Sequence, residues 1–518
     1  MRPVTACDAC RTNKRKCRLD SNDTICTRCR ELNLSCSLRG WTVRSPYTVP
    51  TVPTPRLAPH PPTSPETPTS SNQESPSVEL QKELVTLYFL VVHDTHHSIF
   101  HRPTVEQQIT DGEFPDILLC SVMALGAPFS DNPLFAGIDR RRRGDKYTER
   151  ARNLLDLADI SVTTIQASIL LATVCFCDSQ TESEALYYSI AIRLALILDL
   201  PNRECDNQVE RQVNLRIWWS LYMIDIWSSM GLNLPRQLDF VERYPLPTNE
   251  EVFLSLQRGV VTPENMECPG LCSEMAILAR KWARIHLFNK AAVNSFIDSQ
   301  SVSVTVDSFA RELQAWSDSL PSYLQETPAN LERYCSLGLG NAFAALHLGY
   351  HYYNEVLFYQ FLAHKPSQER VDSISWYRSQ CEEHALAFCN LLYRCRSTKQ
   401  LQFQCLYVMV GHMLVVTSTV YIHMLVSSDN EAKIKLARQR LGQNFQILTE
   451  MQTYWVSLDV FLSRLQVFHN ACIRSIDEPF RMDQWMLSFL LEHGTAVMER
   501  PLDAGSPDTL RNWFLQTF

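Results

Sequence analysis

Six cysteines near the amino terminus have the spacing of metal ligands. They form two copies of the pattern C-x2-C-x6-C, separated by eight residues, at Cys7, Cys10, Cys17, Cys26, Cys29 and Cys36. A C-x2-C pair lets two thiolates approach one ion from a short turn, and a structural zinc site takes four such ligands. The doubled spacing therefore predicts a thiolate metal site in this part of the chain.

The number of thiolates limits how the ions can be shared. Two separate tetrahedral zinc sites need eight ligands, so six thiolates suffice only if two of them bridge both ions. The symmetric arrangement bridges through Cys7 and Cys26, the first cysteine of each copy, and gives each ion the two remaining cysteines of one copy. Two Zn²⁺ ions are therefore predicted. Because this segment has few apolar residues, zinc binding should supply its folding free energy.

Basic side chains crowd the same segment. Residues 1–44 hold ten Arg or Lys and four Asp or Glu, a net charge of +6, whereas the whole chain carries −8 and the remainder therefore −14. Five basic residues lie between or beside the first three cysteines: Arg11, Lys14, Arg15, Lys16 and Arg18. A rigid cationic surface suits DNA phosphates and the O6 and N7 atoms of guanine. Double-stranded DNA is the predicted partner.

Residues 7–36 closely resemble the DNA-binding module of the fungal binuclear zinc-cluster transcription factors, in both the cysteine pattern and the basic first gap. The resemblance implies two Zn²⁺ ions and a short helix in the first copy. It also implies that Lys14 contacts a CGG-type triplet. Asn13 stands where the family more often has Arg or Lys, and it can hydrogen-bond a base edge but supplies no charge. The basic neighbours that fit phosphate contacts are Arg11, Lys16 and Arg18.

Two features depart from the usual pattern of that family. The segment between the two copies, residues 18–25, lacks the proline that many members have there. No apolar heptad register follows the cluster, so a coiled-coil dimer is not predicted. Dimerisation therefore stays open, with another surface of the body as the alternative.

A proline-rich segment separates the cysteine module from the rest of the chain. Residues 45–77 contain ten prolines, many Ser and Thr, and almost no aliphatic residue. Proline lacks an N–H and biases its predecessor away from helix, so a disordered linker is predicted. The predicted organisation is a zinc-cluster DNA-binding domain over 1–44, a disordered Pro-rich linker over 45–77 and an all-α regulatory domain over 78–518.

Beyond residue 78 the apolar residues recur at helical spacing, and prolines separate the segments. The clearest helical segments are 80–91, 163–177, 185–200, 215–230, 272–293, 341–364, 381–395 and 401–426. No strand pattern or fixed-period repeat accompanies them. Over about residues 80–430 these segments also resemble the middle homology region of the same family. The fold class is thus a small two-zinc module, a disordered Pro/Ser/Thr-rich linker and a large all-α regulatory domain.

Four histidines invite a metal interpretation. His93, His96, His97 and His101 would share one helical face, but Pro103 is expected to end that helix soon after. Structural roles, as caps and polar contacts in the core, are predicted for them instead.

Three other stretches have competing interpretations. Arg140–Arg143 fit equally a nuclear import signal or a charged helix start or loop. Residues 338–343, GLGNAF, imitate a dinucleotide fingerprint but lack its third glycine and a preceding strand, so a helix start is expected. Residues 406–426 contain no Asp, Glu, Lys or Arg and could span a membrane, but their histidines and the lack of a second span favour a buried core helix.

The motifs and the composition together narrow the function. No apolar leader precedes Cys7, so an intracellular, reducing compartment is expected, where such cysteines bind metal rather than form disulfides. No nucleophile elbow, Walker loop or H-E-x-x-H motif is present, so no enzyme is predicted. We expect a nuclear, sequence-specific transcription factor of RNA polymerase II genes, pathway-specific as many relatives are, that reads a short GC-rich, CGG-like site.

The expected partners are DNA, transcriptional coregulators and a candidate small-molecule effector, with no membrane. Two alternatives stay open. One is a thiolate-based metal sensor, and the other is an effector-binding or metabolic protein with a structural zinc domain.

Overall fold

The computed structural model describes residues 76–500 with gaps at 240–241, 258–267, 295–298, 364–370, 398–404 and 475–479, and before them Cys17, Cys26, Cys29 and Leu32. The contacts divide the chain into two units, Met1–Glu74 and Ser75–Phe518. The linker predicted over 45–77 lies outside the described residues except for its last two. The domain boundaries stay predictions.

The second unit is helical, and its described residues form no strand. Its amino-terminal helices are α3 (Val78–Val91), α4 (Arg102–Asp111), α5 (Asp116–Gly126), α6 (Asp145–Leu154), α7 (Val162–Cys177), α8 (Thr181–Ile197) and α9 (Gln208–Gly231). Short 3-10 helices are η1 (Ala127–Phe129), η2 (Pro133–Phe135), η3 (Arg140–Arg142) and η4 (Leu200–Asn202). The predicted all-α class is confirmed for this unit.

The carboxy-terminal helices complete the unit. They are α10 (Glu250–Ser255), α11 (Leu271–Val293), α12 (Ser299–Ser319), α13 (Pro328–Ser336), α14 (Gly340–Phe358), η5 (Tyr359–Phe361), α15 (Val371–Ser397), α16 (Met409–Ser427), α17 (Glu431–Gln452), α18 (Ser457–Arg474) and α19 (Gln484–Leu491).

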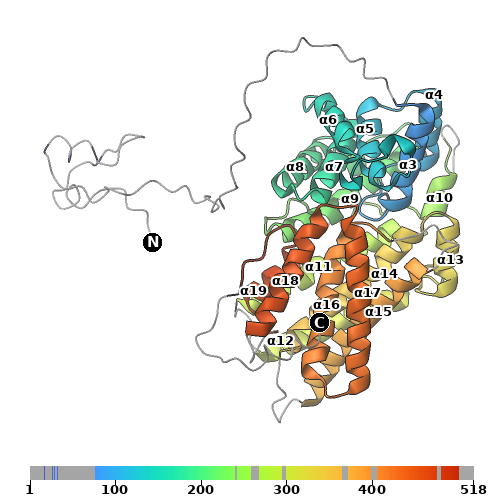
Figure 1. Ribbon diagram of the computed structural model, residues 1–518. Helices are drawn as coiled ribbons and strands as arrows, with labels where there is room; N and C mark the ends of the chain where they lie inside the picture. Colours follow the sequence, from blue (N-terminus) through green and yellow to red (C-terminus); the bar gives the residue numbers. More distant parts are fainter. Residues whose placement is uncertain are drawn as a thin grey trace. The chain divides into compact units, whose positions relative to one another are not determined.

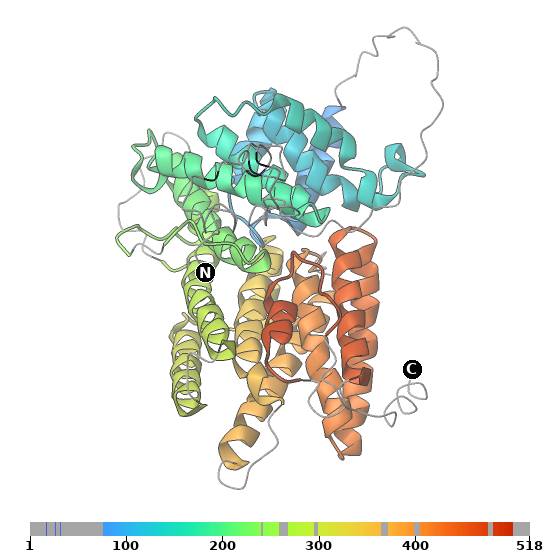
Figure 2. The same ribbon diagram turned by 90° about the vertical axis from the view of Figure 1, so that its left-hand side faces the viewer.

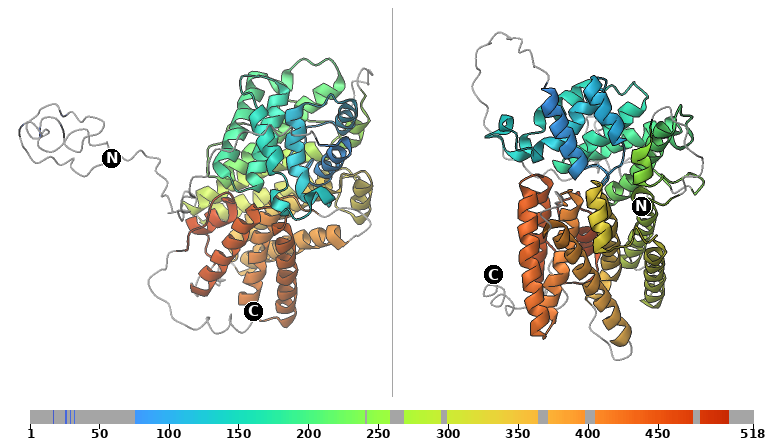
Figure 3. Two further views of the ribbon diagram at one scale, coloured as in Figure 1. Left: turned by 45° about the horizontal axis from the view of Figure 1, so that its top comes forward. Right: turned by 90° about the vertical axis from the view of Figure 1, so that its right-hand side faces the viewer.

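These helices gather in two groups within the unit. Helices α3 to α9 cluster at one end, and α11, α14, α16, α17 and α18 run alongside one another at the other end (Figures 1, 2 and 3). Sequence neighbours pair, as in α7 with α8, α14 with α15 and α16 with α17, and α9 packs on α11. One hydrophobic core runs through both groups, so they form one folded body.

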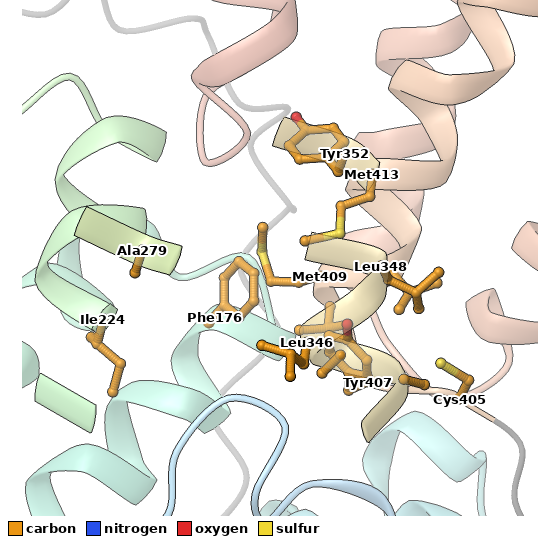
Figure 4. Close-up of a cluster of buried hydrophobic side chains, with 14 of the residues drawn as sticks. Phe176, Ile224, Ala279, Leu346, Leu348, Tyr352, Cys405, Tyr407, Met409 and Met413 are labelled. Carbon is orange, nitrogen blue, oxygen red and sulfur yellow. The ribbon is translucent and has the colours of Figure 1, made fainter. Parts of the chain in front are cut away.

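The two groups meet through buried apolar side chains (Figure 4). Ile224 of α9 and Ala279 of α11 lie near Leu346 of α14 and near Met409 and Met413 of α16, and all five are buried. Methionine adapts its shape to irregular spaces, which suits a junction of helices that cross at several angles.

Local signals set several helix starts. Ser161 precedes α7, and its hydroxyl accepts a hydrogen bond from the backbone N–H of Thr164. At the start of α9, the side-chain oxygen of Asn207 accepts a hydrogen bond from the backbone N–H of Glu210 at 3.0 Å. Such caps satisfy backbone donors that a helix start leaves without an intrahelical partner.

Most of the predicted helices are confirmed, although several of their ends differ. The helix predicted over 341–364 ends at Phe358 and tightens into the 3-10 helix η5. The helix predicted over 401–426 begins only at Met409 among the described residues. Cys405 has a φ of 50°, which an α-helix does not tolerate, and the Trp455 indole N–H binds the carbonyl of Leu406 at 2.7 Å.

Within the part of the chain that the structure describes, helix α16 is long and apolar enough to cross a membrane. Counting the bent pair Arg102–Asp111 and Asp116–Phe129 as one broken span would add a second candidate among the described residues. However, 94% of the apolar window of α16 is buried inside the helical body. This agrees with the predicted core helix.

Candidate metal centre and nucleic-acid interface

The first unit buries cysteines and exposes a leucine. Cys26 and Cys29, the second C-x2-C pair, are 0% and 1% exposed, and Cys17 is half-buried. Leu32, three residues after Cys29, is 54% exposed. A hydrophobic core would place the leucine inside, because leucine gains more from burial than a small thiol does. Among the residues described here, the two thiols of the pair are therefore buried and the leucine is not, which suits cysteines that serve as ligands.

The other predicted site residues lie outside the described residues. These are the metal ligands Cys7, Cys10 and Cys36 and the DNA contacts Arg11, Asn13, Lys14, Arg15, Lys16 and Arg18. Their roles stay predictions, and so does the arrangement of the cluster.

The described cysteines nevertheless fit a zinc cluster. Cys29 has helical backbone, and Cys26 precedes it by three residues, the separation from which a C-x2-C pair binds one ion. Buried thiols in a segment this poor in apolar residues suit thiolate ligands, since metal binding can replace a core as the source of folding free energy.

His93, His96 and His97 lie in a turn and His101 directly precedes α4, so the four do not share a helix and the predicted helical face was wrong. Helix α3 ends at Val91, and Asp94 has a φ of 63°, which carries the chain out of the helix. Pro103 stands in the first turn of α4, with His101 as the cap residue, so it begins a helix rather than ending one. Proline suits this position because its missing N–H has no intrahelical acceptor there.

Each histidine instead has a structural contact, as predicted. The ring of His93 accepts the backbone N–H groups of Ile99 and Phe100, both at 3.1 Å. His97 bonds the Tyr88 hydroxyl at 2.8 Å. The other two pairs are His96 with Tyr188 and His101 with Thr104.

Burial keeps two of these histidines uncharged, and among the described residues they gather with no further metal ligands. Burial lowers the pKa of His96 to about 4 and holds that of His97 well below its usual value, so both are neutral at pH 7. Within the described part of the chain, no three His, Cys, Asp or Glu side chains gather to hold a metal.

The four consecutive arginines contact their own unit. Arg140 pairs with Asp131, Arg141 with Asp459 of α18 at 3.1 Å, and Arg142 with Asp145 at 2.8 Å. The guanidinium of Arg143 donates to the carbonyls of Ser130 and Ile138. Three of them form the 3-10 helix η3, which favours the structural alternative over an import signal.

The glycine-rich stretch at 338–343 is a helix boundary, as expected. Gly338 has a φ of 74°, and α14 begins at Gly340. Glycine is the residue that adopts such a left-handed conformation after a helix most readily. No dinucleotide loop is formed.

Sequence reasoning missed a buried ion pair. Arg216 in α9 is 1% exposed, and its guanidinium donates to Glu250 at 3.2 Å and lies over the ring of Phe253. Glu250 also accepts the backbone N–H groups of Leu271 and Cys272, at 2.7 and 3.0 Å, where α11 begins. The pair therefore joins α9, α10 and α11. The available signal was a lone arginine inside the apolar segment LRIWWSL.

Comparison with known families matches two regions of the chain. Residues 5–44 match the fungal Zn(2)-Cys(6) binuclear cluster domain. Residues 85–318 match the fungal specific transcription factor domain. The first match covers all six cysteines, and the second covers helices from within α3 to α12.

Curated relatives are distant and longer. An uncharacterized transcriptional regulatory protein of Schizosaccharomyces pombe is 25% identical over 54% of this chain and 32% of its own length. A second such protein of that yeast is 20% identical over 78% of this chain and 54% of its own. The activator of stress genes 1 of Saccharomyces cerevisiae is 23% identical over 54% of this chain and 31% of its own length. The chain thus spans about a third to a half of these relatives.

Proposed function

Since the chain belongs to the fungal binuclear zinc-cluster transcription factors, we propose that it regulates transcription of RNA polymerase II genes in the nucleus by binding short GC-rich sites. This family consists of regulators of transcription and not of enzymes. The pairing of a zinc-binding, DNA-binding module with a helical domain is the observation that carries the proposal. Control of one pathway is part of it, by likeness to other members.

Two Zn²⁺ ions hold the DNA-binding module in this proposal. Cys7 and Cys26 would be shared by the two ions, Cys10 and Cys17 would complete the ligands of one, and Cys29 and Cys36 would complete those of the other. The burial of Cys26 and Cys29 supports this assignment. When bound, zinc supplies structural cross-links, and the chain's own side chains supply every contact to DNA.

The basic residues beside the first three cysteines divide into two roles. Lys14 reads a guanine edge of a CGG-like triplet, with Asn13 beside it able to bond a second base. The phosphate contacts come from Arg11, Arg15, Lys16 and Arg18. The net charge of +6 on residues 1–44 supports this division, since phosphate attraction supplies most non-specific affinity.

The helical unit regulates the DNA-binding module and meets coregulators. The chain beyond residue 44, which contains this unit, carries the net negative charge, and that charge repels the phosphates of DNA. A small-molecule effector would act through this unit, and nuclear import would use the basic residues of the first module.

Substitution of two neighbouring lysines tests the DNA-binding roles. Lys14→Ala should reduce the free energy of binding to a CGG-containing duplex by about 1–3 kcal/mol, and it should reduce the discrimination against a scrambled duplex. Lys16→Ala, the matched control, should weaken both duplexes alike and lower the slope of log affinity against log salt by about 1. Fluorescence anisotropy with the zinc-loaded full chain measures both. If Lys14→Ala retained full selectivity, the base-reading role would be wrong.

A further inference from the structure

A cavity of about 580 Å³ lies among the amino-terminal helices of the second unit, lined by residues of α4, α5, α7 and α9. Exposed residues of the connection before α9, Arg203, Glu204 and Asp206, stand at its rim, which marks the opening to solvent. Sites for small organic molecules commonly enclose about 300–1,000 Å³. The size therefore fits a ligand of one or two rings.

The wall is mixed, with more polar than apolar surface. Its buried apolar side chains are Phe100, Val105, Phe114, Leu118 and Val209. These side chains can take up an apolar ring, because apolar surface gains free energy on leaving water, whereas the polar part of the wall requires polar groups on the same ligand.

Two buried carboxamides supply acceptors in the same wall. Gln166 and Asn214 are 7% and 5% exposed. The Gln166 amide donates to the carbonyl of Ile99 at 2.7 Å, and the Asn214 amide donates to the sulfur of Cys205 at 3.2 Å. Within the described part of the chain, no group donates to either carboxamide oxygen. Both oxygens are therefore available to N–H or O–H groups of a ligand.

The rim is negatively charged. Glu204, Asp206 and Glu210 outnumber the two nearby cations, Arg203 in the lining and Arg211 close to the lining residue Cys205. Glu210 accepts a hydrogen bond from the side chain of Asn207 at 3.0 Å, and no described Lys or Arg forms an ion pair with the other two carboxylates. A ligand that carries positive charge at the opening gains from this imbalance, and an anion is repelled.

We propose that this cavity binds a small organic amine whose protonated nitrogen lies at the acidic rim and whose apolar ring carries an N–H group toward Gln166 and Asn214. The binding itself depends only on the cavity. Its regulatory consequence, a change in DNA affinity, rests on the proposed function.

Tryptamine is the probe that combines these features, since it has an aromatic ring, a ring N–H and an ammonium group. Tryptophol and indole-3-acetate keep the ring and replace the cation by a neutral hydroxyl and by an anion. Calorimetric titration of the zinc-loaded full chain should give affinities in the order tryptamine, tryptophol, indole-3-acetate, with about tenfold or more between the first and the last. No binding of tryptamine, or equal binding of the anion, would overturn the proposal.

Substitutions locate the probe. Thr163→Trp, at a half-buried position of the wall, should fill the space and abolish tryptamine binding. The paired change Glu204→Gln with Asp206→Asn should remove most of the preference for tryptamine over tryptophol. Glu149→Gln, an exposed acid on α6 outside the lining, is the matched control and should change nothing. Tryptamine binding that survives Thr163→Trp would place the probe elsewhere and refute the site.

The role of the Asn214 oxygen as a hydrogen-bond acceptor is tested by comparing two probes on one variant. Asn214→Leu should weaken tryptamine but leave 1-methyltryptamine, which has no ring N–H, nearly unchanged. Equal effects on both probes would refute the acceptor role. Adding tryptamine to the anisotropy assay then tests regulation. Failure of the titration leaves the Lys14→Ala comparison intact, and failure of that comparison leaves the titration intact, so the two hypotheses fail separately.

Discussion

Glu355 is a carboxyl group in the middle of the helical core. It is 0% exposed on α14, and one of its oxygens accepts a hydrogen bond from the Thr417 hydroxyl of α16 at 2.8 Å. Burial raises its pKa to about 8, and the bond from Thr417 offsets this only in part. The side chain is therefore protonated at pH 7, which avoids a buried charge without a counter-ion.

This protonation makes stability depend on pH. The folded state holds a proton that the unfolded chain releases near pH 4.5, so stability is lost as pH rises from about 4.5 to about 8. Glu355→Gln is neutral at every pH and should reduce that slope by about 1.4 kcal/mol per pH unit in mid-window. Urea unfolding between pH 5 and pH 8.5 measures it. Glu184, whose pKa burial also raises to about 8, should keep some slope in the variant.

The exposed acid Glu149 serves as the control for this measurement. Glu149→Gln should keep the wild-type slope, because an exposed side chain changes its surroundings little on unfolding. If Glu355→Gln and the wild type had the same slope, Glu355 would be ionised in the folded protein.

At the scale of single residues, the cysteines could be predicted and the buried polar groups could not. Six cysteines at fixed spacing restrict each other's chemistry, so sequence alone predicts their role. Arg216 and Glu250 are 34 residues apart, and only the packing of α9, α10 and α11 brings them together. The burial of Glu355 likewise depends on α14 and α16 packing side by side.

Two glycines show how closely the helices approach. A β-carbon on Gly126, the last residue of α5, would lie 2.1 Å from the backbone oxygen of Leu84 in α3. The two helices therefore touch through their backbones at this point. Gly442 lies exposed within α17, and a β-carbon there would meet nothing within 4 Å.

Alanine substitution should separate the two cases. Gly126→Ala should destabilise the protein by about 1–3 kcal/mol or more, because backbone must shift to admit the methyl group. Gly442→Ala should stabilise it by about 0.5–1 kcal/mol, since alanine loses less conformational freedom in a helix. Thermal unfolding at one pH compares both with the wild type. A neutral Gly126→Ala would contradict the close approach of α3 and α5.

At the scale of elements, periodicity predicted most helices, but not every irregular end. In the histidine turn and at residues 405–408, the sequence has a spacing of side chains that is also typical of a helix. Their backbone is held otherwise by contacts distant in sequence, such as the indole of Trp455 on the carbonyl of Leu406. Tertiary hydrogen bonds of this kind override local helix propensity, which differs between ordinary residues by only about a few tenths of a kcal/mol.

At the scale of the whole molecule, the two units should respond differently to metal removal. A chelator should abolish DNA binding and release two zinc ions per chain, because the first unit has few apolar residues to hold it. The helical unit should keep its circular-dichroism spectrum and its unfolding temperature, since its described residues contain no cluster of side chains that could hold a metal ion. Metal analysis, anisotropy and thermal unfolding on one sample check all three. A large fall in the unfolding temperature would contradict the independence of the units.

The sequence by itself determined the zinc-cluster module and the helical class of the body, because ligand spacing and apolar periodicity are local properties of a chain. The tertiary structure alone decided which polar groups became buried partners, where helices met through glycine, and that a cavity with an acidic rim opened beside α9. These features arise where segments far apart in sequence pack together, and no local pattern records which segments will meet.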